Sequence, residues 1–199
     1  MAEKTIDIAS PILSRNERLA DQLRQRFNET NTYVINVLSS PGSGKTTTIL
    51  GTNERLRDKA GLRCAVIEGD IASDVDAITM KEAGMPAIQI NTGGLCHLEG
   101  NMIMEAVDAF DQAVGLQNID VIFIENVGNL VCPVDFDLGE NLSIMILSVP
   151  EGDDKPIKYP GIFQHSCSTR STWLRLSILT WMGILRHSMT SIRRRHGLP

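Results

Sequence analysis

Residues 39–46 read SSPGSGKT, a glycine-rich sequence that ends in Lys-Thr. It follows a run of β-branched residues and opens a segment with helical character, which is the setting of a phosphate-binding loop (a Walker A motif). Gly42 and Gly44 let the backbone turn successive N–H groups toward phosphate oxygens. Lys45 is expected to reach the β- and γ-phosphates, and the Thr46 hydroxyl to bind Mg²⁺. The sequence therefore predicts binding of a nucleoside triphosphate with Mg²⁺.

Strand-like and helix-like segments alternate on both sides of this loop. The predicted strands are residues 33–39, 62–68, 87–90, 121–125 and 142–149. The predicted helices are residues 11–29, 44–60, 74–83 and 98–113. Such alternation is typical of βαβ units. We therefore expect an α/β protein of the P-loop NTPase type, with a mostly parallel sheet flanked by helices and a ligand site at the carboxyl ends of the strands.

Acidic residues close two of the predicted strands. Asp70 follows the strand at 62–68 and Glu125 ends the strand at 121–125. An acid at this position can hold Mg²⁺ directly or through water, so we assign both residues to the magnesium site with Thr46. An alternative for Asp70 is a cap for the helix that follows. The predicted catalytic residues are Lys45, Thr46, Asp70 and Glu125.

The nucleotide-binding set extends beyond the phosphate loop itself. The N–H of Gly128, just after the strand that ends at Glu125, is placed to meet the γ-phosphate. The residues expected to contact the nucleotide are Gly42, Ser43, Gly44, Lys45, Thr46, Thr47 and Gly128. One position departs from the usual motif, because Ser39 stands where its first glycine is expected.

Two short motifs carry candidate metal ligands. Cys96-His97 follows a pair of glycines, and Cys132 precedes a proline after the Glu125 strand. Thiolate and imidazole suit Zn²⁺ or Ni²⁺. Three such ligands leave a tetrahedral site open to water, a second chain or an exchangeable ligand. The alternative is that each cysteine is a buried small apolar residue, which is how we interpret Cys64.

Composition narrows the class of function. The net charge of −5 argues against nucleic acid as the main partner. The sequence has no apolar run of about 18 residues, so no membrane span is expected. The first residues show no signal peptide, and we expect a cytoplasmic protein.

These segments together resemble the hydrogenase nickel-incorporation GTPase family (HypB), whose relatives include the urease accessory GTPases. The resemblance is carried by SSPGSGKTT (39–47), EGDIASDVDA (68–77), INTGGLCHLE (90–99), IENVGNLVCP (124–133) and EGDDKPIKYPGIF (151–163). Ser39 agrees with the pattern of that family. No N-terminal Cys-rich or His-rich nickel motif, which some members have, occurs in residues 1–30.

The resemblance implies a GTPase that binds GTP and Mg²⁺, forms a homodimer on nucleotide or metal binding, and delivers Ni²⁺ during assembly of [NiFe] hydrogenase. Its implied partners are the hydrogenase large subunit and other maturation factors. It also implies that Cys96, His97 and Cys132 form a nickel site, which Zn²⁺ can occupy, shared across the dimer interface. The chain is then expected to consist of an N-terminal helical segment (1–30), a P-loop GTPase domain (31–166) and an atypical tail (167–199).

The tail departs from the rest of the chain. All 24 acidic residues precede residue 167, whereas the tail holds arginine but no lysine. The family continues here with a strand ending in Asn-Lys-x-Asp, whose Asp binds the guanine edge. Codons allowed for Cys167–Leu174, read two nucleotides later, encode Leu-Asn-Lys-Val-Asp-Leu. We therefore hypothesise a frameshift near residues 166–167 that leaves the sheet incomplete at its C-terminal edge, and the coding DNA is the test.

Two other functions stay open at this point. A P-loop kinase acting on a small molecule would use the same phosphate loop but leaves the Cys and His residues without a role. A truncated metal-binding protein without guanine specificity would bind ATP and GTP equally. The leading prediction is a GTP-hydrolysing nickel metallochaperone.

Overall fold

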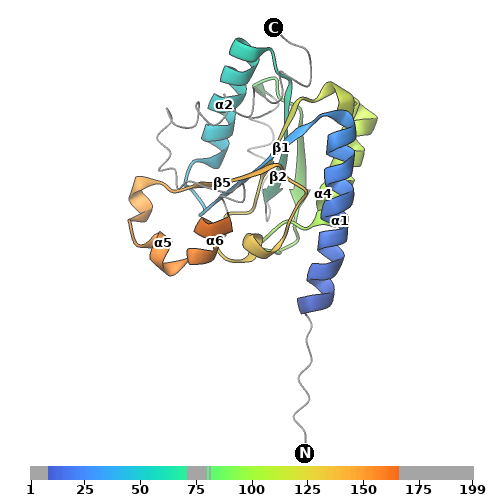
Figure 1. The fold of residues 1–199 in the computed structure, drawn as a ribbon. Coiled ribbons are helices and arrows are strands. Elements are labelled where there is room, and N and C mark those ends of the chain that lie inside the picture. The colour runs from blue at the N-terminus through green and yellow to red at the C-terminus, as the bar shows by residue number, and fades with distance from the viewer. Residues whose placement is uncertain (1–8, 71–79, 81, 166–199) are drawn as a thin grey trace, which may run out of the picture. The chain divides into compact units, whose positions relative to one another are not determined.

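Five parallel strands form one sheet at the centre of the domain. In spatial order they are β3 (Ala87–Asn91), β2 (Cys64–Asp70), β4 (Val121–Glu125), β1 (Tyr33–Ser39) and β5 (Leu142–Ile146). Every pairing between neighbours is parallel. The computed structural model describes residues 9–70, 80 and 82–165. Figure 1 shows the strands running between helices, which confirms the predicted α/β class.

The strands form where the sequence is apolar and rich in β-branched residues. All five residues of β4 are buried, as are six of the seven in β1 and in β2. Strands buried on both faces read as continuous apolar runs, and a parallel sheet needs helices on both sides. This is why the short segments VIFIE and YVINVLS could be recognised as strands.

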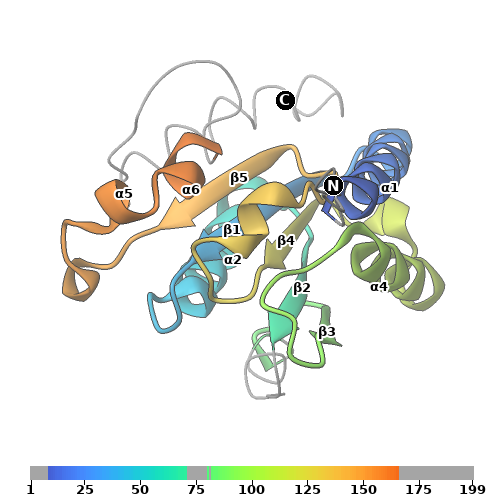
Figure 2. The same ribbon diagram turned by 90° about the horizontal axis from the view of Figure 1, so that it is seen from below.

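Helices cover the two faces of the sheet (Figure 2). α2 (Lys45–Ala60) lies on one face, and α1 (Ala9–Thr30) packs with α4 (Gly100–Ala113) on the other. The largest core cluster joins α1, α4 and the sheet residues that face them. It includes Leu23, Phe27, Val34, Ala65, Ile67, Ile103, Val107, Phe110, Ile122 and Ile124, each at most 2% exposed.

α1 is anchored through a buried asparagine. The Asn16 side chain is 5% exposed; it accepts a hydrogen bond from the Gly100 N–H at 2.7 Å and donates one to the Asp137 carbonyl at 2.7 Å. A Cβ on Gly100 would lie 2.9 Å from Leu19 Cβ, so only glycine allows this approach of α1. Arg26 adds ion pairs to Asp108 and Asp111 of α4. The N-terminal helix is therefore part of the domain and fixes the start of α4.

After β5 the chain forms three short turns of helix. They are η3 (Val149–Glu151), α5 (Lys155–Lys158) and α6 (Pro160–His165). Leu38, Leu130 and Ile162 form a smaller buried cluster under this region. No helix in the described residues is both long and apolar enough to cross a bilayer.

Most predicted boundaries agree with the structure to within two residues, with one clear exception. The strand predicted at 142–149 ends at Ile146, because Pro150 and a capping box between Ser148 and Glu151 start the η3 turn. β2 begins at Cys64 and reaches Asp70, two residues later than predicted at each end. Most of the helix predicted at 74–83, and the whole tail 167–199 with its hypothesised frameshift, lie outside the described residues.

Candidate nucleotide and metal sites

The phosphate loop joins β1 to α2 and has the backbone that phosphate binding needs. Gly42 and Gly44 have φ angles of 73° and 91°, in the left-handed region. In the described residues, apart from the chain neighbours, no atom lies within 4 Å of a Cβ built on either glycine, so the requirement there is conformational rather than steric. Lys45 Nζ donates to the hydroxyl of the buried Ser39 at 3.2 Å. Ser39 thus takes part in holding the loop lysine.

Two of the three magnesium residues predicted from sequence, Thr46 and Glu125, are in contact at the end of the sheet. Thr46, in the first turn of α2, donates from its hydroxyl to a Glu125 carboxylate oxygen at 2.9 Å. Glu125 ends β4 and is 5% exposed. A hydroxyl and a carboxylate are the hard oxygen ligands that Mg²⁺ prefers, and they lie at the N-terminus of the helix that follows the phosphate loop. The residues present therefore fit a magnesium ion bound with the nucleotide.

β2 carries two acids near its carboxyl end. Asp70 is the last residue of the strand and is half-buried. Glu68 is 2% exposed and is the direct partner of Glu125 in the pairing of β2 with β4. The sequence analysis assigned Asp70 but gave Glu68 no role. The pairing of β2 with β4 identifies Glu68 as the neighbour of Glu125. This pairing is known only once the strands are aligned in the structure. The residues that would show whether Asp70 caps a helix lie outside the described part.

Gly128 packs directly on the phosphate loop. A Cβ at this position would lie 2.8 to 2.9 Å from the Pro41 nitrogen, Cα and Cγ. A residue larger than glycine would therefore displace the loop. Ser43 is buried with its hydroxyl bonded to the Ser40 carbonyl at 2.8 Å, whereas Thr47 is exposed. Contacts of Gly128, Ser43 and Thr47 with nucleotide stay predictions.

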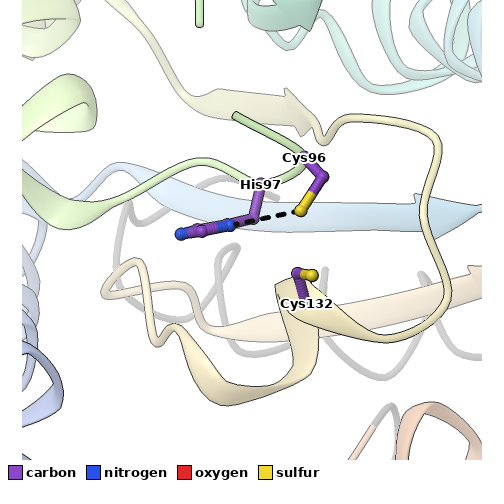
Figure 3. Close-up of side chains that lie close together, drawn as sticks. All are labelled: Cys96, His97 and Cys132. Atoms are coloured by element: carbon purple, nitrogen blue, oxygen red, sulfur yellow. Dashed lines mark hydrogen bonds between the residues drawn. The ribbon is translucent and has the colours of Figure 1, made fainter. Parts of the chain in front are cut away.

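The three candidate ligands of the cargo metal come together from two loops (Figure 3). One ligand atom each from Cys96, His97 and Cys132 lie within 4.8 Å of one another. Cys96 and His97 belong to the loop between β3 and α4, and Cys132 is the first residue of η2 (Cys132–Asp135). All three side chains are half-buried. Cys132 is distant along the chain from the Cys96-His97 pair, and the fold joins them into a Cys₂His cluster.

Neighbouring groups shape this cluster. The His97 ring stacks on Phe136, with ring centroids 3.9 Å apart, and its Nδ1 is 3.8 Å from Cys96 Sγ. A hydrogen bond with Cys96 is the main cause that raises the pKa of Cys132, while the Asn129 side chain lowers it. A divalent cation would favour the thiolates, so the donor set fits Ni²⁺ or Zn²⁺. Sequence reasoning missed Phe136, for which no local signal exists.

The candidate nucleotide and metal sites share one connecting segment. Residues 126–131 run from Glu125 to Cys132, and Asn126 is 1% exposed. The Asn126 side-chain oxygen accepts from the Leu98 N–H at 3.3 Å, directly beside His97. Its amide nitrogen donates to Asn36 of β1 at 3.3 Å. The end of β4 is therefore connected to Cys132 by the chain and to the loop of His97 by a hydrogen bond.

The remaining described cysteine has a different environment. Cys64 begins β2 and is 6% exposed. Burial, with a smaller effect from Asp120, raises the pKa of its thiol to about 12. This agrees with the interpretation of Cys64 as a structural apolar residue. Cys167 lies outside the described residues.

Comparison with known families assigns the domain. Residues 33–147, from the start of β1 to just beyond β5, match the family model for the CobW/HypB/UreG nucleotide-binding domain. The chain belongs to the CobW/HypB/UreG family. The match includes the phosphate loop and all three candidate ligands of the Cys₂His cluster.

Named members of this family are similar over most of the chain. The hydrogenase/urease maturation factor HypB of Helicobacter hepaticus is 46% identical over 161 residues, which are 81% of this chain and 65% of that protein. The hydrogenase maturation factor HypB of Escherichia coli K12 is 47% identical over 160 residues, 80% of this chain and 53% of that one. The chain thus spans about half to two thirds of the length of these relatives.

A solved structure from the family has the same fold. The crystal structure of HypB from Helicobacter pylori in complex with nickel superimposes with a TM-score of 0.71 at 43% sequence identity. The match covers 76% of this chain and 69% of that one. The CobW/HypB/UreG assignment and this likeness together support the predicted P-loop NTPase fold.

Proposed function

We propose that this chain is a GTP-hydrolysing metallochaperone that delivers nickel during [NiFe] hydrogenase maturation. The observation that carries the proposal is that one domain holds both a phosphate loop and a Cys₂His cluster, joined by residues 126–131. The nickel-bound Helicobacter pylori relative and the relatives named as hydrogenase maturation factors support it. A small-molecule kinase would have no use for the cluster.

The nucleotide is held by the phosphate loop in this proposal. Backbone N–H groups around Gly42 and Gly44 surround the phosphates, and Lys45 leaves Ser39 to contact the β- and γ-phosphates. Thr46, Glu125 and Asp70 hold Mg²⁺, which neutralises charge on the phosphates when bound. Thr46 must exchange its bond to Glu125 for the metal, so loading with nucleotide changes the position of the β4 end.

Nickel is the cargo and binds to Cys96, His97 and Cys132. Half-burial limits water at the cluster and still leaves a path for transfer. Hydrolysis acts as a timer, because loss of the γ-phosphate releases the segment that holds Gly128 and leads to Cys132. The chemistry is therefore phosphoryl transfer to water, used to change metal affinity.

The cluster offers three ligands, so a fourth comes from elsewhere. Exposed apolar side chains flank both cysteines: Leu95 is 41% exposed and Val131 is 58% exposed. We propose that this rim meets a second copy of the chain when nucleotide or metal is bound. Transfer then proceeds in the cytoplasm to the hydrogenase large subunit with the help of other maturation factors.

The proposal is tested by measuring nucleotide and nickel binding on the same protein. The expected result is preference for GTP over ATP, slow Mg²⁺-dependent GTP hydrolysis, and nickel binding that is lost in Cys132→Ala. Phosphorylation of a small molecule would instead indicate a kinase. Equal affinity for ATP and GTP without hydrolysis would indicate a metal-binding protein without guanine specificity.

A further inference from the structure

The two nitrogens of the His97 ring have different surroundings. Nδ1 faces the Cys96 thiol at 3.8 Å, on the side of the Cys₂His cluster. Nε2 is buried and lies 3.4 Å from a carboxylate oxygen of Glu99. Only Nδ1 is therefore directed toward Cys96 and the metal position. A ring nitrogen that is to bind metal must be free of hydrogen, and the partner of the other nitrogen decides which one that is.

The Glu99 backbone is held at the start of α4, whereas its carboxylate does not cap that helix. Its extended backbone (φ −121°, ψ 159°) immediately precedes α4, and its carbonyl accepts from the Met102 and Ile103 N–H groups. The next residue, Gly100, is held by Asn16 of α1. The Glu99 side chain makes no capping hydrogen bond to the helix. Its carboxylate instead approaches His97 Nε2, without forming a hydrogen bond to it.

Phe136 fixes the plane of the same ring from another loop. It stacks on His97 with an interplanar angle of 26° and follows the turn that begins with Cys132. The stack and the carboxylate meet different parts of the ring: Phe136 lies against its face, and Glu99 approaches its Nε2 edge.

We propose that Glu99 is a positioning residue for the cargo metal: it accepts the Nε2–H of His97, so that Nδ1 donates its lone pair to nickel beside Cys96 and Cys132. This inference rests on the proposed metal site. A carboxylate behind a histidine ligand orients the ring and makes the ligand nitrogen more basic. The 3.4 Å contact is longer than an ordinary hydrogen bond, and we expect it to shorten when nickel draws the ring into place.

The experiment is a Ni²⁺ titration of the 199-residue protein, with Glu99→Ala and Glu105→Ala as a matched pair. Glu105 is an exposed acid of α4, six residues after Glu99. Loss of a carboxylate behind a metal-binding histidine weakens metal binding about 10- to 100-fold, so this is expected for Glu99→Ala and not for Glu105→Ala. Glu99→Gln keeps an acceptor oxygen and should recover part of the affinity.

A spectroscopic readout separates positioning from a loss of structure. Nickel K-edge X-ray absorption of the loaded wild-type protein should contain imidazole scattering, which Glu99→Ala should weaken while the sulfur scattering stays. Nickel affinity in Glu99→Ala within twofold of the wild type would overturn the inference, provided that Cys132→Ala abolishes binding. If Cys132→Ala also binds normally, the metal site itself is wrong, and this inference is overturned with it.

Discussion

Thr46 donates its hydroxyl hydrogen to Glu125 at 2.9 Å, which links the first turn of α2 to the end of β4. In the proposed function these oxygen atoms bind the magnesium ion of the nucleotide. We therefore expect nucleotide loading to exchange this hydrogen bond for metal–oxygen bonds. Asn126, the residue after Glu125, accepts a hydrogen bond from the Leu98 N–H in the loop that carries Cys96 and His97.

Replacement of Thr46 should separate metal-dependent from metal-independent nucleotide binding. Valine has nearly the same shape as threonine but lacks the hydroxyl. We therefore expect the GTP affinity of Thr46→Val in excess Mg²⁺ to fall at least about tenfold, which corresponds to the loss of one charge-assisted interaction. Fluorescent-nucleotide titration measures it. In EDTA the variant and the wild type should bind alike. A difference that persists in EDTA would mean that Thr46 acts on the loop rather than through Mg²⁺.

Gly128→Ala should damage the phosphate loop. The added methyl group would lie 2.8 to 2.9 Å from Pro41 atoms, so the loop must shift. Overpacking of this kind costs about 1–3 kcal/mol, and we expect weaker GTP binding together with a lower free energy of unfolding. Urea unfolding and nucleotide titration check both. Gly161→Ala is the control, because its nearest neighbour would be Val134 at an ordinary 3.8 Å; equal behaviour of the two variants would contradict the packing argument.

Asn16→Ala should loosen α1 from the domain. The substitution leaves the Gly100 N–H and the Asp137 carbonyl without their buried partner. Each unsatisfied buried group costs about 1–3 kcal/mol, so the free energy of unfolding should fall by at least that much. Ser14→Ala, at an exposed position of the same helix, should change it by no more than about 0.5 kcal/mol. A stability of Asn16→Ala equal to that of Ser14→Ala would show that α1 is not anchored there.

The cysteines should differ in reactivity. With a pKa of about 12, the Cys64 thiol stays protonated until the pH approaches that value, and only about one molecule in ten thousand is thiolate at pH 8. Cys96 and Cys132 are half-buried at the cluster. Iodoacetamide at pH 8 should therefore label Cys96 and Cys132 before Cys64, as read by peptide mass spectrometry. Added Ni²⁺ should protect the first two only; protection of Cys64 would argue against the assigned cluster.

The parts of the site that are local in sequence could be predicted, and those that depend on pairing could not. Gly42, Gly44 and Lys45 stand at the fixed spacing of the phosphate-loop motif, and Glu125 ends an apolar strand. Each can therefore be proposed as a site residue from the sequence alone. Glu68 is identified as the neighbour of Glu125 only by the pairing of β2 with β4.

The neighbours of the metal cluster could not be predicted from the sequence either. The Cys96-His97 pair is visible as a motif, but the stack on Phe136 joins residues that are distant along the chain. Glu99 stands two residues after His97, and its approach to Nε2 depends on how α4 begins. The end of β5 was placed too late because apolar residues recur at Leu147 and Val149, while Pro150 and the Ser148–Glu151 capping box start a turn.

We propose that the nucleotide and nickel sites are coupled through residues 126–131. The direct measurement is the nickel dissociation constant of the 199-residue protein with GDP–Mg²⁺ and with a non-hydrolysable GTP analogue and Mg²⁺. Coupling energies between sites are typically 1–3 kcal/mol, so we predict a difference of at least about fivefold between the two nucleotides. We expect this difference to disappear in Asn126→Ala, which loses the bond to Leu98. Equal nickel affinity in the two nucleotide states, with both nucleotides shown to be bound, would contradict the proposed coupling of the two sites.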